Sequence, residues 1–256
     1  MASNFPLIVA HRGASYIAPE NTIPSFKIAF QENADFIEGD FWLTKDNEIV
    51  CIHDSNTGRV GNKNIKVISS TLAELKNVDV GIKRGKEYEG TTIPALQEIL
   101  QIIPESKGLH LEIKDNREKI LIRLKEILKE SNIPSGKIRI ISFHKNIIRA
   151  VKKYLPEIKA YLIFGWYFSK GEYFKSLAQR LIFRKISSVN CNGLVLYANS
   201  YIDKKFIQTL KDKSLDICAY NVEGPETAIK LTECGINSLT TNSPLKIRNA
   251  IEVIIK

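Results

Sequence analysis

The stretch LIVAHRGASYIAPENTIPSFKIAF, residues 7–30, sets the pattern that the rest of the chain follows. Its apolar run Leu7–Ala10 is typical of a buried β-strand, and Ile23–Glu32 has the apolar spacing of an amphipathic helix. His11 and Arg12 follow the run directly. The first strand therefore delivers a titratable group and a fixed positive charge to one point.

The same order of strand and helix recurs along the whole chain. Short apolar or β-branched runs predict strands at Leu7–Ala10, Phe36–Asp40, Leu109–Lys114, Ile138–Ser142, Lys159–Ile163, Gly193–Leu196, Leu215–Tyr220 and Ser238–Thr241. Helical patterns follow at Ile23–Glu32, Ala95–Ile103, Glu118–Ser131, Lys145–Tyr154, Glu172–Arg184, Asp203–Asp212, Pro225–Cys234 and Leu245–Ile255. Eight such repeats in 256 residues predict an α/β fold, a closed (β/α)₈ TIM barrel that forms a single domain over residues 1–256. An open doubly wound sheet is the alternative, but no G-x-G-x-x-G follows the first strand.

Two segments lie outside the repeat. In FWLTKDNEIVCIHD, residues 41–54, the polar triplet Asp46–Glu48 separates two apolar stretches, which predicts a hairpin whose return strand ends at His53. The segment 55–92 is rich in Gly, Lys and Asn and is too long for an ordinary loop. We expect it to form a small insertion after the second strand.

Composition excludes several classes of protein. The chain is 44% hydrophobic and 25% charged, which is typical of a globular protein. No apolar run reaches the length of a membrane span, and no export signal precedes the first strand, so we expect a cytoplasmic protein. The four cysteines form no C-x-x-C pair, which argues against a zinc knuckle or a disulfide framework.

The formal net charge of +9 is compatible with an anionic partner. No nucleic-acid-binding motif is present, so we expect no nucleic acid partner. Residues 161–185 are dense in aromatic and basic side chains, a composition that suits weak contact with a membrane surface, a wall of the substrate site or plain packing. The sequence leaves these three interpretations, and the oligomeric state, open.

In a barrel of this kind, active sites are built at the carboxyl ends of the strands. Polar residues gather at these ends in the first three predicted strands and the hairpin: His11, Arg12, Glu38, Asp40, His53, Glu112 and Lys114. Glu38 and Asp40 are two residues apart and so face the same side of their strand, as do Glu112 and Lys114. Each residue alone could be a buried structural group, a solvated strand end or part of an ion pair. Their joint placement favours a functional site.

The residue types indicate phosphoryl chemistry. The carboxylates Glu38, Asp40 and Glu112 would repel one another in a closed barrel mouth, and a divalent cation, Mg²⁺ or Ca²⁺, would remove that repulsion. Arg12 and Lys114 suit the binding of phosphate oxygens. With pKa values near neutrality, the two histidines His11 and His53 can act as general base and general acid.

Three motifs resemble the glycerophosphodiester phosphodiesterase family: HRGASYIAPENTIPSF (11–26), ADFIEGDFWLTKDNEIVCIHD (34–54) and LHLEIK (109–114). The resemblance implies a (β/α)₈ barrel that hydrolyses a glycerophosphodiester to sn-glycerol 3-phosphate and an alcohol, by attack of the glycerol 2-hydroxyl and hydrolysis of a cyclic phosphate. It places the catalytic histidines on His11 and His53 and phosphate binding on Arg12 and Lys114. The metal carboxylates fall on Glu38, Asp40 and Glu112.

Some positions depart from the family pattern. The run YNVE, residues 220–223, replaces a Trp-Thr-Val-Asn run, while His110 and Asn242 stand where Asn and Asp are expected. Two other functions therefore remain open at this point. One is a barrel phosphodiesterase of phospholipase type that acts on phosphatidylinositol, a sphingolipid or a lysophospholipid, and the other is a non-catalytic anion-binding protein.

Overall fold

The computed structural model describes residues 5–165, 172–198 and 202–255. Within them, one sheet contains β1 (Leu7–Ala10), β2 (Phe36–Leu43), β3 (Ile49–Cys51), β4 (Gly108–Ile113), β5 (Ile138–Ser142), β6 (Lys159–Phe164), β7 (Gly193–Tyr197), β8 (Asp216–Tyr220) and β9 (Ser238–Thr241). β1 pairs in parallel with both β9 and β2, which closes the eight parallel strands into a ring, and β3 lies outside the ring. The predicted (β/α)₈ TIM barrel is confirmed.

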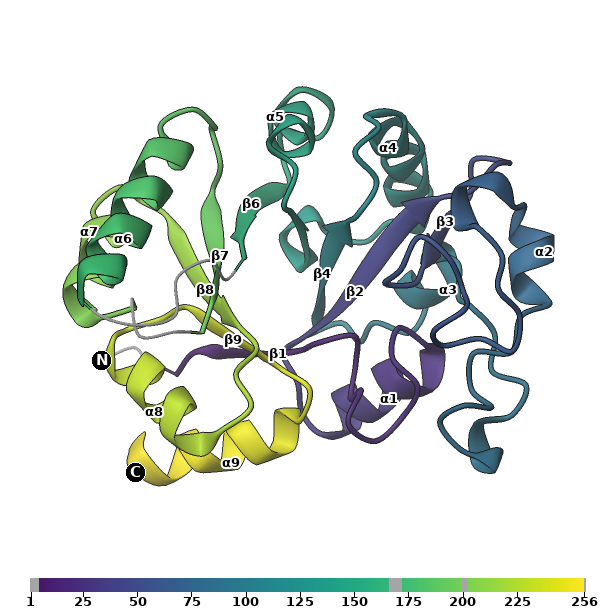
Figure 1. The fold of residues 1–256 in the computed structure, drawn as a ribbon, viewed down its shortest axis with the longest axis horizontal. Coiled ribbons are helices and arrows are strands. Elements are labelled where there is room, and N and C mark those ends of the chain that lie inside the picture. The colour runs from purple at the N-terminus through teal and green to yellow at the C-terminus, as the bar shows by residue number, and fades with distance from the viewer. Residues whose placement is uncertain (1–4, 166–171, 199–201, 256) are drawn as a thin grey trace.

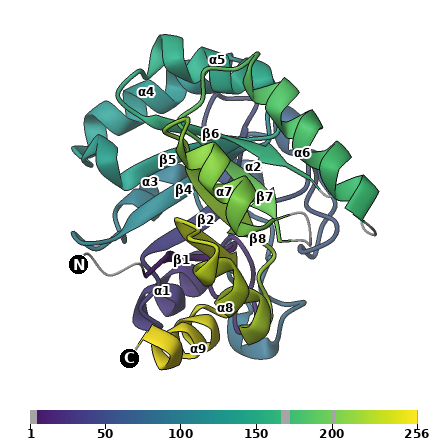
Figure 2. The same cartoon turned by 90° about the vertical axis from the view of Figure 1, so that its left-hand side faces the viewer.

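Helices cover the outside of this ring, except for α2, which lies in the segment after β3 (Figures 1 and 2). They are α1 (Ile23–Gln31), α2 (Leu72–Lys76), α3 (Leu96–Leu100), α4 (Lys119–Ser131), α5 (Lys145–Tyr154), α6 (Glu172–Ile186), α7 (Lys204–Lys211), α8 (Pro225–Glu233) and α9 (Pro244–Ile255), with 3₁₀ turns η1 (Val67–Ser69), η2 (Lys86–Tyr88) and η3 (Ser135–Lys137). Leu111 and Ile113 of β4 are buried in the core between strands and helices, as their parity predicts. The alternate side chains of β4 therefore face the barrel interior.

A separate apolar cluster lies inside the barrel. It comprises Ile141, Tyr161, Ile163, Val195 and Cys218, with Tyr220 packed against it. Beside it, the His110 ring meets Tyr161 edge to face, with 6.3 Å between the ring centroids. This cluster fills the barrel interior next to the polar side chains at the strand ends.

The predicted hairpin is present, with two corrections to its limits. Phe41 pairs with Cys51 and Leu43 with Ile49, so β2 runs to Leu43 instead of ending at Asp40. The return strand ends at Cys51 and not at His53. Both corrections have a physical cause, because antiparallel pairing with β3 extends β2 beyond the barrel rim and leaves His53 in the loop after the hairpin.

The segment after β3 packs on β3 through a small hydrophobic cluster, made of Val50, Ile52, Val67, Leu75, Val78, Val80 and Ile93. α2 begins in a capping box, in which the Thr71 side chain accepts from the Glu74 backbone N–H and Glu74 accepts from that of Thr71. In Figure 1 this segment lies at one edge of the barrel, beside β3. It thereby forms a side wall next to the first two strands.

The aromatic and basic segment 161–185 is described only in part, because residues 166–171 lie outside the described residues. In the described part, Tyr161 is fully buried, and Phe183 of α6 packs edge to face on Phe206, with 5.7 Å between centroids. These contacts are packing contacts, and weak membrane-surface contact stays a prediction. No helix in the described part of the chain is both long and apolar enough to cross a bilayer.

Candidate active site

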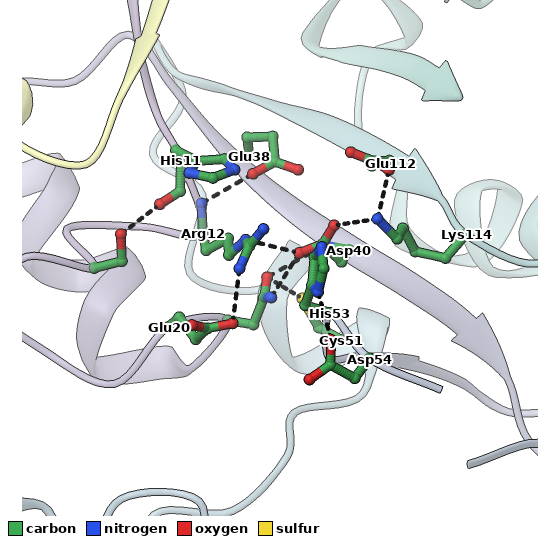
Figure 3. Close-up of polar contacts among 12 residues, drawn as sticks. His11, Arg12, Glu20, Glu38, Asp40, Cys51, His53, Asp54, Glu112 and Lys114 are labelled. Atoms are coloured by element: carbon green, nitrogen blue, oxygen red, sulfur yellow. Dashed lines mark hydrogen bonds and ion pairs between the residues drawn. The ribbon is translucent and has the colours of Figure 1, made fainter. Parts of the chain in front are cut away.

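Three buried carboxylates meet inside the barrel mouth (Figure 3). Glu38 and Asp40 face inward from β2, and the strand register sets Asp40 beside Glu112 of β4. One oxygen from each of the three lies within 4.8 Å of the others. The spacing of two residues on β2 and the parallel pairing of β2 with β4 bring these groups together, as the sequence predicts.

The close approach of the carboxylates perturbs their ionisation. Burial, followed by the negative charge of Asp40, raises the pKa of Glu38 to about 8 and that of Glu112 to about 8. Burial would also raise the pKa of Asp40, but the charges of Arg12 and Lys114 outweigh it and lower that pKa. Asp40 is therefore the carboxyl group of the site that ionises most readily, and a compensating positive charge would favour ionisation of Glu38 and Glu112 as well.

The three carboxylates fit a hard divalent cation. Glu38 Oε1 and Asp40 Oδ1 are buried and accept no hydrogen bond from any described residue. Mg²⁺ and Ca²⁺ prefer oxygen ligands of this kind, and their positive charge would offset the repulsion that raises the two pKa values. The site can therefore bind a divalent cation, whose identity the donor set leaves open.

Arg12 is held in a fixed orientation next to this triad. Its backbone N–H donates to Glu38 Oε2 at 2.9 Å, its Nη1 donates to Glu20 at 3.0 Å, and its Nε lies 3.2 Å from Asp40 Oδ2. Its φ of 55° and the φ of 82° at Gly13 turn the chain sharply, and a Cβ at Gly13 would overlap Ser25. Arg12 Nη2 has no hydrogen bond to a described residue, so this nitrogen can reach an incoming oxyanion.

Lys114 supplies a second positive charge on the other side of the triad. Its Nζ lies 2.9 Å from Glu112 Oε1 and 3.5 Å from Asp40 Oδ1. Burial would lower its pKa, but the negative charges of Glu112 and Asp40 raise it above the ordinary value. Lys114 is therefore fully charged at neutral pH and, like Arg12, suits the binding of phosphate oxygens.

His11 is oriented by a neutral amide. Its Nδ1 lies 2.8 Å from Asn242 Oδ1, which also accepts from the Ser15 hydroxyl at 2.8 Å. The Asn242 amide nitrogen donates to Glu223 at 2.9 Å, and this bond fixes which end of the amide faces the histidine. His11 must therefore carry its proton on Nδ1, while Nε2 keeps its lone pair. Burial and the nearby Arg12 charge lower the pKa of His11, which favours this neutral form.

His53 has a charged partner instead. Its Nδ1 lies 2.7 Å from Asp54 Oδ1, and its side chain is 30% exposed. Burial lowers the pKa of His53, although Asp40 and the Asp54 hydrogen bond act in the opposite direction. The two histidines therefore have different hydrogen-bond partners. His11 is bound by an amide, whereas His53 is bound by a carboxylate that can stabilise an imidazolium.

These groups line one cavity of about 230 Å³. Six of the seven residues predicted from the sequence line it directly, namely His11, Arg12, Glu38, His53, Glu112 and Lys114, and Asp40 lies behind them in the triad. Phe143 and Ile141 form an apolar wall, and a second cavity of about 580 Å³ adjoins it at His11 and Arg12. A molecule with a central anionic group and two arms would fit such a pair of cavities.

Several partners of these residues were not predicted as site residues. Glu20 forms a hydrogen bond with Arg12, Asp54 forms one with His53, and Arg59 donates to Asp54. Asp54 directly follows His53 and Glu20 lies in the PENT motif, and these adjacencies are the only sequence signals that could have identified them. Arg59 carries no such signal.

Comparison with known proteins decides the family. A sequence profile described as the glycerophosphoryl diester phosphodiesterase family matches residues 11–246. The chain belongs to this family. It is an enzyme of the glycerophosphodiester phosphodiesterase class, which decides against the non-catalytic anion-binding alternative.

Relatives of this phosphodiesterase match most of its length. YhdW of Bacillus subtilis (strain 168), a provisionally named glycerophosphodiester phosphodiesterase, is 31% identical over 239 residues, 93% of this chain and 94% of YhdW. A glycerophosphodiester phosphodiesterase of Caldanaerobacter subterraneus is 39% identical over 166 residues, 62% of this chain and 66% of that protein. Among solved structures, a phosphodiesterase of Oleispira antarctica in complex with the product sn-glycerol-3-phosphate superposes with a TM-score of 0.81 at 28% identity, covering 96% of this chain and 97% of that one.

Proposed function

We propose that this phosphodiesterase hydrolyses glycerophosphodiesters to sn-glycerol 3-phosphate and an alcohol, with His11 and His53 as the acid–base pair. The carrying observation is that both histidines, Arg12 and Lys114 line one cavity beside three buried carboxylates. The product complex of the Oleispira antarctica phosphodiesterase supports the choice of product. We further propose that residues 1–256 act as one barrel domain in which 55–92 is an insertion.

Binding of the phosphate comes first. The guanidinium of Arg12 and the ammonium of Lys114 flank the carboxylates from two sides and would hold two phosphoryl oxygens between them. The small cavity has an apolar wall on Phe143 and Ile141 and suits the three-carbon glycerol arm, while the larger adjoining cavity suits the alcohol. In this orientation the phosphorus lies where the two cavities meet, next to His11.

In the first chemical step, His11 Nε2 accepts the proton of the glycerol 2-hydroxyl as that oxygen attacks phosphorus. The bond from phosphorus to the alcohol oxygen breaks, and His53 gives this oxygen its proton. The partners support this assignment, because the Asn242 amide favours a neutral His11, whereas the Asp54 carboxylate can stabilise the imidazolium form of His53. In the second step the roles reverse, and water opens the cyclic phosphate to sn-glycerol 3-phosphate.

A divalent cation would be held by Glu38, Asp40 and Glu112. When bound, it would supply positive charge to a phosphoryl oxygen as charge develops there. The three carboxylates bind and orient it, and Asp40 also aligns Arg12 through the 3.2 Å contact to Nε. We leave the choice between Mg²⁺ and Ca²⁺ to experiment.

The substrate class is tested by ³¹P NMR on a panel of phosphodiesters. The panel contains glycerophosphocholine, glycerophosphoethanolamine, glycerophosphoinositol, a lysophospholipid, phosphatidylinositol and a sphingolipid. We expect the signal of sn-glycerol 3-phosphate to appear from the glycerophosphodiesters, preceded by a transient cyclic phosphate. Faster cleavage of the intact lipids would instead establish the phospholipase-type alternative, and release of a phosphorylated alcohol would contradict the proposed bond cleavage.

A further inference from the structure

One side chain of the segment 55–92, Arg59, connects two carboxylates at the rim of the site. Its Nε donates to Asp54 Oδ2 at 2.6 Å. Its Nη1 and Nη2 donate to the two oxygens of Glu20 at 2.8 and 2.7 Å. A planar guanidinium thus binds three carboxylate oxygens at once, a geometry that no other side chain can reproduce.

Each of the two carboxylates holds one residue of the proposed mechanism. Asp54 uses its other oxygen to bind His53 Nδ1 at 2.7 Å, and Glu20 Oε1 accepts from Arg12 Nη1 at 3.0 Å (Figure 3). The result is a line of alternating groups that runs from His53 through Asp54, Arg59 and Glu20 to Arg12. It joins the proposed general acid to the proposed phosphate clamp.

Arg59 has a specific physical effect on both ends of this line. Asp54 and Glu20 bind the same guanidinium and would repel each other without it. Glu20 shares its carboxylate between Arg59 and Arg12 Nη1, and Asp54 shares its carboxylate between Arg59 and His53. Loss of Arg59 would therefore leave both carboxylates free to move, and the His53 ring and the Arg12 guanidinium would lose their common anchor.

The loop that carries Arg59 is held without its side chain. The Thr57 hydroxyl donates to Lys63 O at 2.6 Å and accepts from the Ile65 N–H at 3.0 Å. Lys83 Nζ donates to the carbonyl oxygen of Gly58 at 2.6 Å. Because the Arg59 side chain is also 46% exposed, its replacement should leave the loop and the barrel folded.

We propose that Arg59 is a positioning residue that fixes the His53 ring and the Arg12 guanidinium in one geometry for phosphodiester cleavage. This inference rests on the proposed function, in which these two residues act on the same phosphorus. It gives the segment 55–92 a role in the reaction, because this segment supplies the residue that connects the partners of His53 and Arg12. The role depends on the shape of the guanidinium and not on its charge alone.

The test compares Arg59→Lys and Arg59→Gln by steady-state kinetics on a glycerophosphodiester. Lysine keeps the charge but has a single nitrogen, so we expect both variants to lose about tenfold or more in kcat and to bind inorganic phosphate, measured as a competitive inhibitor, more weakly. Added guanidinium ion should restore part of the activity of Arg59→Ala. The matched control is Arg123→Lys, because Arg123 bridges Glu48 and Glu126 on the outside of the barrel, at 3.0 and 3.1 Å, and its replacement should leave kcat unchanged.

A second readout does not need turnover. The ring-nitrogen NMR signals of the four histidines should show a shift at His53 in Arg59→Lys and no shift at His110, which is buried against Tyr161. Native kinetics and unshifted His53 signals in Arg59→Lys would overturn the proposal, as would a loss of activity that matches a loss of folded protein by circular dichroism. If the wild-type enzyme cleaves no glycerophosphodiester, the proposed function fails, and the His53 signals still decide whether Arg59 orients the ring.

Discussion

Binding of a divalent cation to the carboxylate triad should depend steeply on pH. In the ion-free protein the pKa values of Glu38 and Glu112 are both about 8, because the two groups are buried beside Asp40. At pH 7 each of them is about one-tenth ionised and at pH 9 about nine-tenths. A cation that needs both groups ionised should therefore bind more tightly at pH 9 than at pH 7, by on the order of 100-fold.

The sign of the effect on folding follows from the same values. The native carboxyl groups hold protons that an unfolded chain, with pKa values near 4.5, would release. These groups therefore stabilise the ion-free protein at low pH, and this contribution is lost as pH rises from about 4.5 through 8. Added cation should raise the melting temperature more at pH 9 than at pH 7.

The assay is calorimetric titration of the ion-free enzyme with Mg²⁺ and with Ca²⁺ at pH 7, 8 and 9. Repeating it in buffers of different ionisation enthalpy counts the protons released, which should approach two at pH 7. The control is Glu38→Gln, which should bind more weakly at every pH and lose about half of the pH dependence on a logarithmic scale. Equal affinity at pH 7 and pH 9, without proton release, would refute the reasoning.

Three further outcomes are expected from the remaining groups. Arg12→Lys keeps the charge but loses the planar fork, so kcat/KM should fall by more than about tenfold, whereas a near-native value would assign Arg12 a structural role. Asn242→Asp places a carboxylate against His11 and should raise the pKa of His11. The acidic limb of the pH profile of kcat/KM should then move upward by about one pH unit, and an unmoved limb would argue against His11 as the base. His11 and His53 should not contribute independently, so the variant lacking both should lose little more activity than either single alanine variant, and a p-nitrophenyl ester should rescue His53→Ala but not His11→Ala. If the double variant loses activity by the full product of the two single losses, or if the ester rescues neither single variant, the paired roles would be contradicted.

The barrel and the triad could be predicted from the sequence because both depend on short periodicities. A spacing of two residues sets Glu38 and Asp40 on one face of a strand wherever that strand lies, and eight strand–helix repeats leave few ways to close a sheet. The hairpin of residues 41–54 was predicted as well, but the second strand was ended at Asp40, whereas pairing of Phe41–Leu43 with β3 makes β2 one continuous strand to Leu43.

The partners of the site residues could not be predicted in the same way. Asn242 orients His11 from 231 residues away, and no local pattern indicates that contact. Arg59 reaches Glu20 only because the loop after β3 folds back over the loop after β1, and such loop conformations depend on backbone turns and anchoring bonds and not on periodicity. The sequence therefore predicted the groups that we propose for the chemistry, and the structure added the groups that contact and orient them.

The central claim is that this enzyme cleaves glycerophosphodiesters with a cation held by Glu38, Asp40 and Glu112. Its most direct test is coupled detection of sn-glycerol 3-phosphate released from glycerophosphoethanolamine by the wild-type enzyme, before and after removal of metal with a chelator. We predict that release stops after chelation, returns on addition of Mg²⁺ or Ca²⁺, and does not return in Glu112→Gln at the same cation concentration. Undiminished release in excess chelator, or full release by Glu112→Gln, would contradict the claim.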